Sequence, residues 1–164
     1  MPDSADTKTF DVVYELSAVA SGVMRNDVRG RMLEPVLDHI FEMATDEGGY
    51  HGGDASAPPP LSYFTTGLVT CLMTQLRASA KRLRIPIGLP KIDARIEWKG
   101  DQVGNQPYVA RGHEFRLDID LQTDTPLAEQ KRVLAAATKS CFVEVILNVP
   151  IHHRLRIDGK WVDA

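Results

Sequence analysis

The chain has 164 residues, of which 43% are hydrophobic and 25% are charged. These values indicate one globular domain, expected over residues 1–164, and exclude a disordered or fibrous chain. Lysine and arginine number 19 against 22 aspartate and glutamate, a formal net charge of -3, so the basic excess that attracts nucleic acid is missing.

The N-terminal residues predict neither secretion nor a membrane anchor. Residues 1–8 are polar and contain no cationic segment followed by an apolar stretch, so we expect a cytoplasmic protein without a membrane partner. The chain holds two cysteines, Cys71 and Cys141. In a reducing compartment such a pair is catalytic, redox-active or simply buried more often than part of a disulfide scaffold.

The N-terminal third is predicted to form strands and turns. From Phe10 to Ala20 apolar residues recur at every second position, the period of a strand with one face on a core. Residues 21–43 mix arginines with apolar residues and contain Pro35, which favours a short second strand with turns over a helix. Residues 46–60 hold four glycines and three consecutive prolines, which predicts a loop leading into a helix.

The next segment predicts a buried helix that carries the first cysteine. Residues 61–76 contain no charged residue, and apolar or small residues recur at helical spacing from Leu61 through Phe64 and Cys71 to Leu83. Sixteen uncharged residues fall short of the roughly 20 that span a bilayer, so this helix is not expected to cross a membrane.

The second half predicts a sheet, another helix and a hairpin. Residues 92–98 and 115–121 alternate strictly and indicate two strands, joined by a loop over residues 100–112. A proline-started helix is expected from Leu127 through Cys141 to Val145. The dipeptide Asp158-Gly159 predicts a tight turn, so the whole chain is expected to be α+β with mainly antiparallel strands.

The segments PPPLSYFTTGLVTCLMTQLRASAKRLRI, DEGGYHGGDASA and KSCFVEVIL resemble the OsmC-like family of osmotically inducible and organic hydroperoxide resistance proteins. The resemblance covers nearly the full length of the chain. It implies an OsmC-like fold in which antiparallel sheets wrap around two central helices in an intertwined homodimer, with the cysteines buried at the dimer interface.

The resemblance also implies a thiol peroxidase that reduces organic hydroperoxides. Cys71, as a thiolate, would attack the peroxide and become a sulfenic acid, which Cys141 would condense to a disulfide. An external dithiol would reduce this disulfide, and no cofactor is expected. An arginine from the N-terminal strands would favour the thiolate by its charge; Arg25 fits best and Arg29 next.

Two positions depart from the family pattern. The family has a glutamate that pairs with the arginine directly after the helix-opening proline, and this chain has Leu61 there. The family's second cysteine begins a Cys-Pro-x-Ser turn, and here Cys141 is followed by Phe142, Val143 and Glu144. On a helix Glu144 would share a face with Cys141. It could pair with Arg25, raise the pKa of the Cys141 thiol by repulsion, or lie partly exposed with neither role.

The candidate substrate-binding residues are His51, Leu61, Phe64 and Phe142. His51 lies in the loop near the helix start and could carry a proton near neutral pH, while Leu61 and Phe142 make the site more apolar. No metal is expected, because His113 and the pair His152-His153 have no zinc-site spacing with the cysteines. Two alternatives stay open: a protein that binds a small apolar ligand at the dimer interface without peroxidase turnover, and a stoichiometric redox sensor.

Overall fold

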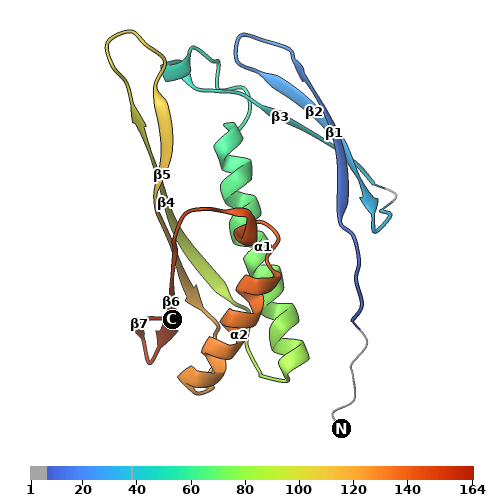
Figure 1. Cartoon of the computed structure of the whole chain (residues 1–164), viewed down its shortest axis with the longest axis vertical. Coiled ribbons are helices and arrows are strands. Elements are labelled where there is room, and N and C mark those ends of the chain that lie inside the picture. Colours follow the sequence, from blue (N-terminus) through green and yellow to red (C-terminus); the bar gives the residue numbers. More distant parts are fainter. Residues whose placement is uncertain (1–6, 38) are drawn as a thin grey trace. The chain divides into compact units, whose positions relative to one another are not determined.

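A computed structural model describes residues 7–37 and 39–164 (Figure 1). The chain forms two compact units, the first ending at Tyr63 and the second beginning at Phe64. The first contains β1 (Val13–Ala20), β2 (Asn26–Glu34), β3 (Ile40–Thr45), the 3-10 turn η1 (Gly49–His51) and the start of α1 (Pro60–Leu83). The second contains the rest of α1, β4 (Lys91–Asp101), β5 (Val109–Asp120), α2 (Leu127–Ser140), the 3-10 turn η2 (Glu144–Ile146), β6 (Ile151–Ile157) and β7 (Lys160–Asp163). The predicted α+β class is confirmed, whereas the single domain over residues 1–164 stays a prediction.

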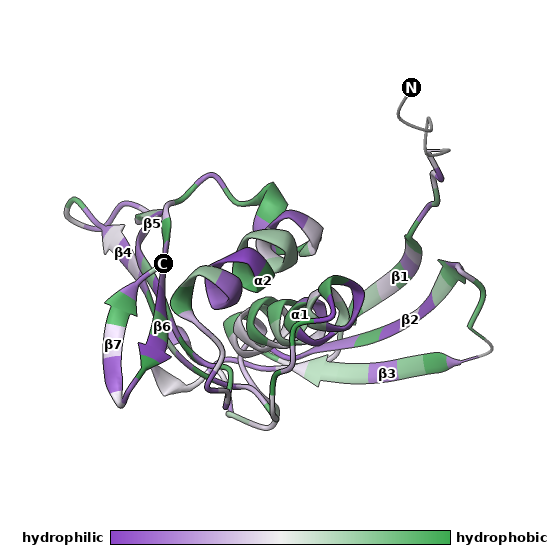
Figure 2. Cartoon of the chain, turned by 90° about the horizontal axis from the view of Figure 1, so that it is seen from below, coloured by the Kyte–Doolittle hydropathy of each residue, from purple (hydrophilic) through white to green (hydrophobic). Residues whose placement is uncertain are grey.

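The sheet of the first unit has one apolar and one charged face. Its strands are antiparallel in the order β1-β2-β3, so cross-strand partners share a face. On one face Leu16, Gly30 and Phe41 are opposite one another, and a side chain on Gly30 would collide with the Phe41 ring. On the other face Arg31 pairs with Glu15 at 2.8 Å. Figure 2 shows the mostly hydrophobic β3 beside the mixed colouring of β2.

The first strand differs from the sequence prediction in length and burial. It begins at Val13 rather than Phe10, and its apolar residues Tyr14 and Leu16 are 54% and 56% exposed. Alternation therefore identified an apolar strand face correctly, but this face is not buried within the chain. The predicted short second strand is a full strand, β2, followed by β3 after the turn that contains Pro35.

The sheet of the second unit has the order β4-β5-β6-β7, with antiparallel pairs except for the parallel pair β5–β6. The predicted hairpin loop between β4 and β5 is shorter than the expected 100–112, because backbone pairing continues to Asp101 and Val109 although the alternation of the side chains has ended. The predicted turn between β6 and β7 is confirmed. Asp158 and Gly159 both have positive φ, 47° and 76°, as a type I′ turn requires.

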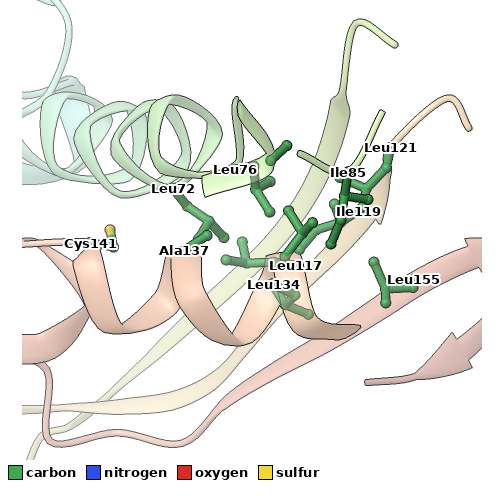
Figure 3. Packing of buried hydrophobic residues seen from close by; sticks show 12 residues of the cluster. Leu72, Leu76, Ile85, Leu117, Ile119, Leu121, Leu134, Ala137, Cys141 and Leu155 are labelled. Carbon is green, nitrogen blue, oxygen red and sulfur yellow. The ribbon is translucent and has the colours of Figure 1, made fainter. Parts of the chain in front are cut away.

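The core of the second unit lies between the two helices and this sheet (Figure 3). The buried stripe of α1 consists of Leu68, Leu72 and Leu76, four residues apart, as the helical spacing predicted. Each fully buried leucine contributes about 1.5–3 kcal/mol through removal of apolar surface from water. Leu61 departs from the prediction of a helix buried from its first turn, since it is 52% exposed.

The residues that complete this core come from α1, β5, α2, β6 and the adjoining segments. They are Leu72, Leu76, Ala80, Ile85, Leu117, Ile119, Leu121, Val133, Leu134, Ala137, Cys141 and Leu155. Over residues 7–37 and 39–164, no helix is both long and apolar enough to cross a membrane.

Candidate active site

The two cysteines lie side by side where α1 and α2 pack together. Cys71 is on the face of α1 next to the buried stripe and is half-buried, whereas Cys141 directly follows α2 and is fully buried. The two thiols lie close enough for Cys71 to raise the pKa of Cys141. Figure 3 shows Cys141 beyond Ala137 at one end of the labelled core residues. The fold therefore brings together two residues that are 70 positions apart, as the sequence analysis required but could not establish.

The surroundings of Cys141 keep its proton on the sulfur. Burial and the neighbouring Cys71 raise the pKa of the Cys141 thiol, and the backbone N–H groups of Glu144 and Val143 lower it; together they place the pKa at about 12. Near neutral pH Cys141 is consequently a neutral thiol. Of the two cysteines, only Cys71 is partly exposed to solvent.

The turn after α2 begins at Cys141. The predicted helix to Val145 is wrong, because α2 ends at Ser140 and Cys141 adopts an extended conformation (φ -84°, ψ 102°). The N–H groups of Glu144 and Val143 lie near the sulfur and lower its pKa, while the N–H group of Cys141 donates to the Thr138 carbonyl at 3.3 Å as the helix ends.

Glu144 has a different partner from those considered in the sequence analysis. Its Oε1 lies 2.9 Å from Nε2 of His153, and its side chain is only 10% exposed. Its pairing with Arg25, which belongs to the first unit, stays a prediction, and the residue as a whole is partly exposed. The pKa of Cys141 is raised mainly by burial and not by repulsion from the Glu144 carboxylate. The backbone N–H group of Glu144 lowers this pKa.

Arg25 is anchored within the first unit by Asp27 and Ser56. Its Nη2 and Nε donate to Asp27 Oδ1 at 2.9 and 3.1 Å, and its Nη1 donates to Ser56 Oγ at 3.0 Å. Asp27 thus supplies a carboxylate partner for Arg25, which Leu61 cannot. The Arg-x-Asp spacing at the start of β2 was the signal that could have revealed this pair. Arg29, the second choice, lies 3.6 Å from Glu42 with both side chains mostly exposed. The approach of either arginine to Cys71 stays a prediction.

Ser56 is itself held by the buried Asp46. Asp46 is 2% exposed and its carboxylate accepts hydrogen bonds from the Ser56 N–H and hydroxyl at 2.9 and 2.8 Å, and from the Glu47 N–H at 2.9 Å. These bonds lower the pKa of Asp46 below its ordinary 3.8. The loop before α1 and the arginine are therefore joined in one network, Asp46–Ser56–Arg25–Asp27.

Replacing Asp46 with asparagine is expected to lower the free energy of unfolding above about pH 4 and to flatten its loss in acid. A carboxylate whose pKa is lower in the folded state stabilises the fold above its ordinary pKa, and this contribution disappears as pH falls through the folded value. Urea unfolding between pH 3 and pH 7 measures it. Asp54→Asn, an exposed change in the same loop, is the matched control; equal pH dependence of the two variants would contradict the prediction.

The four candidate substrate-binding residues are distributed over both units. His51 lies 3.3 Å from Glu47 in the loop of the first unit, where Leu61 also belongs. Phe64 and Phe142 belong to the second unit, and Phe142 is 51% exposed. The structure therefore leaves their contact with a substrate as a prediction.

Phe64 begins a row of aromatic rings that sequence reasoning missed. Its ring lies 6.0 Å from Trp98 on β4, and Trp98 lies 5.3 Å from Phe115 on β5, both in edge-to-face geometry. Trp98 directly follows a break in the register of β4. No cluster of three or more histidine, cysteine or acidic side chains able to hold a metal ion occurs in the part of the chain that the structure describes.

Comparison with known proteins identifies relatives of this chain. A family model described as OsmC-like protein matches residues 52–156. An OsmC-like hydroperoxide resistance protein from Jannaschia sp. CCS1 is 37% identical, with 93% of this chain and 98% of that chain covered and a TM-score of 0.53. No curated protein matches the chain.

Two more distant structures share the fold. An organic hydroperoxide resistance protein from Elizabethkingia anophelis, with thiocyanate bound, is 19% identical over 90% of this chain and 98% of that chain, with a TM-score of 0.59. The organic hydroperoxide resistance protein OhrB of Bacillus subtilis is 15% identical over 89% and 98%, with a TM-score of 0.53.

Proposed function

Since this chain belongs to the OsmC-like family, we propose that it reduces organic hydroperoxides through Cys71 and Cys141. The observation that carries the proposal is the paired arrangement of the two thiols, one half-buried and one fully buried and protonated. The 37%-identical relative, a hydroperoxide resistance protein, supports a role in peroxide detoxification.

The proposed reaction has three steps. The Cys71 thiolate attacks one peroxide oxygen, the O–O bond breaks, and a proton from solvent completes the alcohol product, leaving a sulfenic acid on Cys71. Cys141 then forms a disulfide with Cys71 and releases water. An external dithiol reduces the disulfide by exchange and becomes oxidised itself. Arg25 is proposed to favour the Cys71 thiolate, with Asp27 and Ser56 fixing its guanidinium.

The wild-type protein is expected to consume a dithiol catalytically when cumene hydroperoxide is added. Each disulfide is reduced and the thiol pair returns, so consumption continues far beyond one equivalent. Dithiothreitol oxidation followed by absorbance measures it, with reaction mixtures lacking protein as the control. Oxidation that stops at one equivalent indicates a redox sensor. Absence of reaction indicates a ligand-binding protein, and either result contradicts the proposal.

The proposed active form is a homodimer, and two apolar surfaces support it. On the apolar face of the first sheet, Tyr14 and Leu16 are more than half exposed. On α1 the exposed Thr70 and Thr74 donate their hydroxyls to backbone carbonyls four residues earlier, at 2.7 and 3.0 Å. This bonding turns their methyl groups outward and makes a charge-free helix face that a second copy could cover.

Leu16→Asp is expected to convert the dimer to a monomer. A carboxylate on the apolar sheet face would have to be desolvated without a partner in the dimer, at a cost of several kcal/mol. Light scattering after size-exclusion chromatography gives the mass of each species. Ser17→Asp, on the charged face of the same strand, is the control that should remain dimeric, and a monomeric wild type would contradict the prediction.

A further inference from the structure

A histidine occupies a position in β6 where the core otherwise takes aliphatic residues. Leu155 is fully buried, and Ile151 and Ile157 pack against the same core, so the alternation along the strand places His153 on this face. The side chain of His153 is 14% exposed, whereas the adjacent His152 lies on the opposite face and is exposed. An imidazole at a core position needs a polar partner, because burying an unpaired polar group destabilises the fold.

The partner of this imidazole is the carboxylate of Glu144. Oε1 of Glu144 lies 2.9 Å from Nε2 of His153, and the carboxylate side chain is only 10% exposed. The second oxygen, Oε2, is buried and accepts no hydrogen bond from residues 7–37 or 39–164. The two groups are close without the alignment of a hydrogen bond, so their attraction is chiefly electrostatic. Within the described residues, His153 is therefore what holds this carboxylate inside the second unit.

The turn that carries Glu144 has few other attachments to the unit. Phe142, Val145 and Ile146 are 51%, 59% and 72% exposed, whereas Val143 packs against the core. A short exposed turn loses conformational entropy when it is ordered, so side chains have to fix it in place. Here the carboxylate–imidazole pair and the packing of Val143 do so.

Cys141 belongs to the same turn. Its N–H group donates to the Thr138 carbonyl at 3.3 Å, and its carbonyl accepts from the Val145 N–H group at 3.1 Å. The Glu144 carbonyl accepts from the Leu147 N–H group at 3.1 Å. These backbone bonds connect the fully buried Cys141 with the residue that carries the carboxylate. A movement of Glu144 away from β6 therefore also displaces the backbone of Cys141.

We propose that Glu144 and His153 form a latch that keeps Cys141 buried. When the latch is closed, the turn over residues 141–147 is held against β6, and Cys141 can react only with groups inside the fold. When it is open, the turn detaches and Cys141 meets reagents in solvent. The latch acts through the backbone, without contact of either side chain with the sulfur. It is independent of the proposed peroxidase function, because it concerns only access to the thiol.

The alkylation rate of Cys141 measures the opening of the latch. All proteins carry Cys71→Ser, so that Cys141 is the only thiol, and are treated with N-ethylmaleimide in native buffer and weighed intact at successive times. We expect Glu144→Ala and His153→Leu each to raise the alkylation rate at least about tenfold, because breaking a buried pair favours the open turn. His152→Leu, the same substitution on the opposite face of β6, should keep the rate of the parent protein.

Two further measurements distinguish a latch from a general loss of stability. The double variant with Glu144→Ala and His153→Leu should be alkylated at about the rate of the faster single variant, because either change alone opens the latch. In each variant the rate should depend only weakly on urea below the unfolding transition, since a local opening exposes little surface. An unchanged rate in both single variants would overturn the inference. So would single effects that multiply in the double variant, or a rate that rises with the urea slope of global unfolding.

Discussion

Cys71→Ser is expected to abolish peroxide-dependent dithiol consumption, with a loss of roughly three or more orders of magnitude. A serine hydroxyl is not ionised near neutral pH and does not take up an oxygen atom, so the first step has no nucleophile. Cys141→Ser is expected to complete this first step and stop there, because no second thiol lies beside the sulfenic acid. The two variants should therefore fail at different steps although each lacks one thiol.

Intact mass after one equivalent of cumene hydroperoxide distinguishes them. Wild type should lose two hydrogen atoms, Cys141→Ser should gain one oxygen atom that dimedone traps, and Cys71→Ser should stay unchanged. The two variants are matched controls for each other, since the chain has no other cysteine. Oxygen uptake by Cys71→Ser would show that Cys141 attacks the peroxide and that the two assigned roles are reversed. If the wild type and both variants keep their mass, neither cysteine has the role assigned to it.

Leu76→Ala is expected to give the largest loss of stability, about 2–5 kcal/mol in the free energy of unfolding. Leu76 is fully buried in the core between the helices and the second sheet, so truncation removes apolar contacts and leaves a cavity. Urea unfolding followed by the fluorescence of Trp98 and Trp161 measures it. Trp98 lies in the same unit, in ring contact with Phe115.

Leu89→Ala is the matched control for this prediction. Leu89 is 85% exposed, and a surface truncation of this kind changes stability by less than about 0.5 kcal/mol. Similar midpoints for Leu76→Ala and Leu89→Ala would show that the core described here does not stabilise the folded chain.

The amino-acid sequence by itself determined the elements whose signal is local. The charge-free stretch with leucines four residues apart predicted α1, and Asp158-Gly159 predicted the β6–β7 turn, because helical periodicity and positive φ depend on residues close together in the chain. The two cysteines were expected to act as a pair only because of the family resemblance.

Only the tertiary structure decided which side chains meet. The sequence offered Arg25 as one possible partner of Glu144, whereas the structure shows two pairs that the sequence analysis did not consider, His153 with Glu144 and Asp27 with Arg25. The same holds for the end of α2, where the helix stops at Ser140 and Cys141 is extended although the sequence pattern continues to Val145. Hydrogen bonds and ion pairs form between atoms that packing brings within about 3 Å, and residue order alone does not specify that distance.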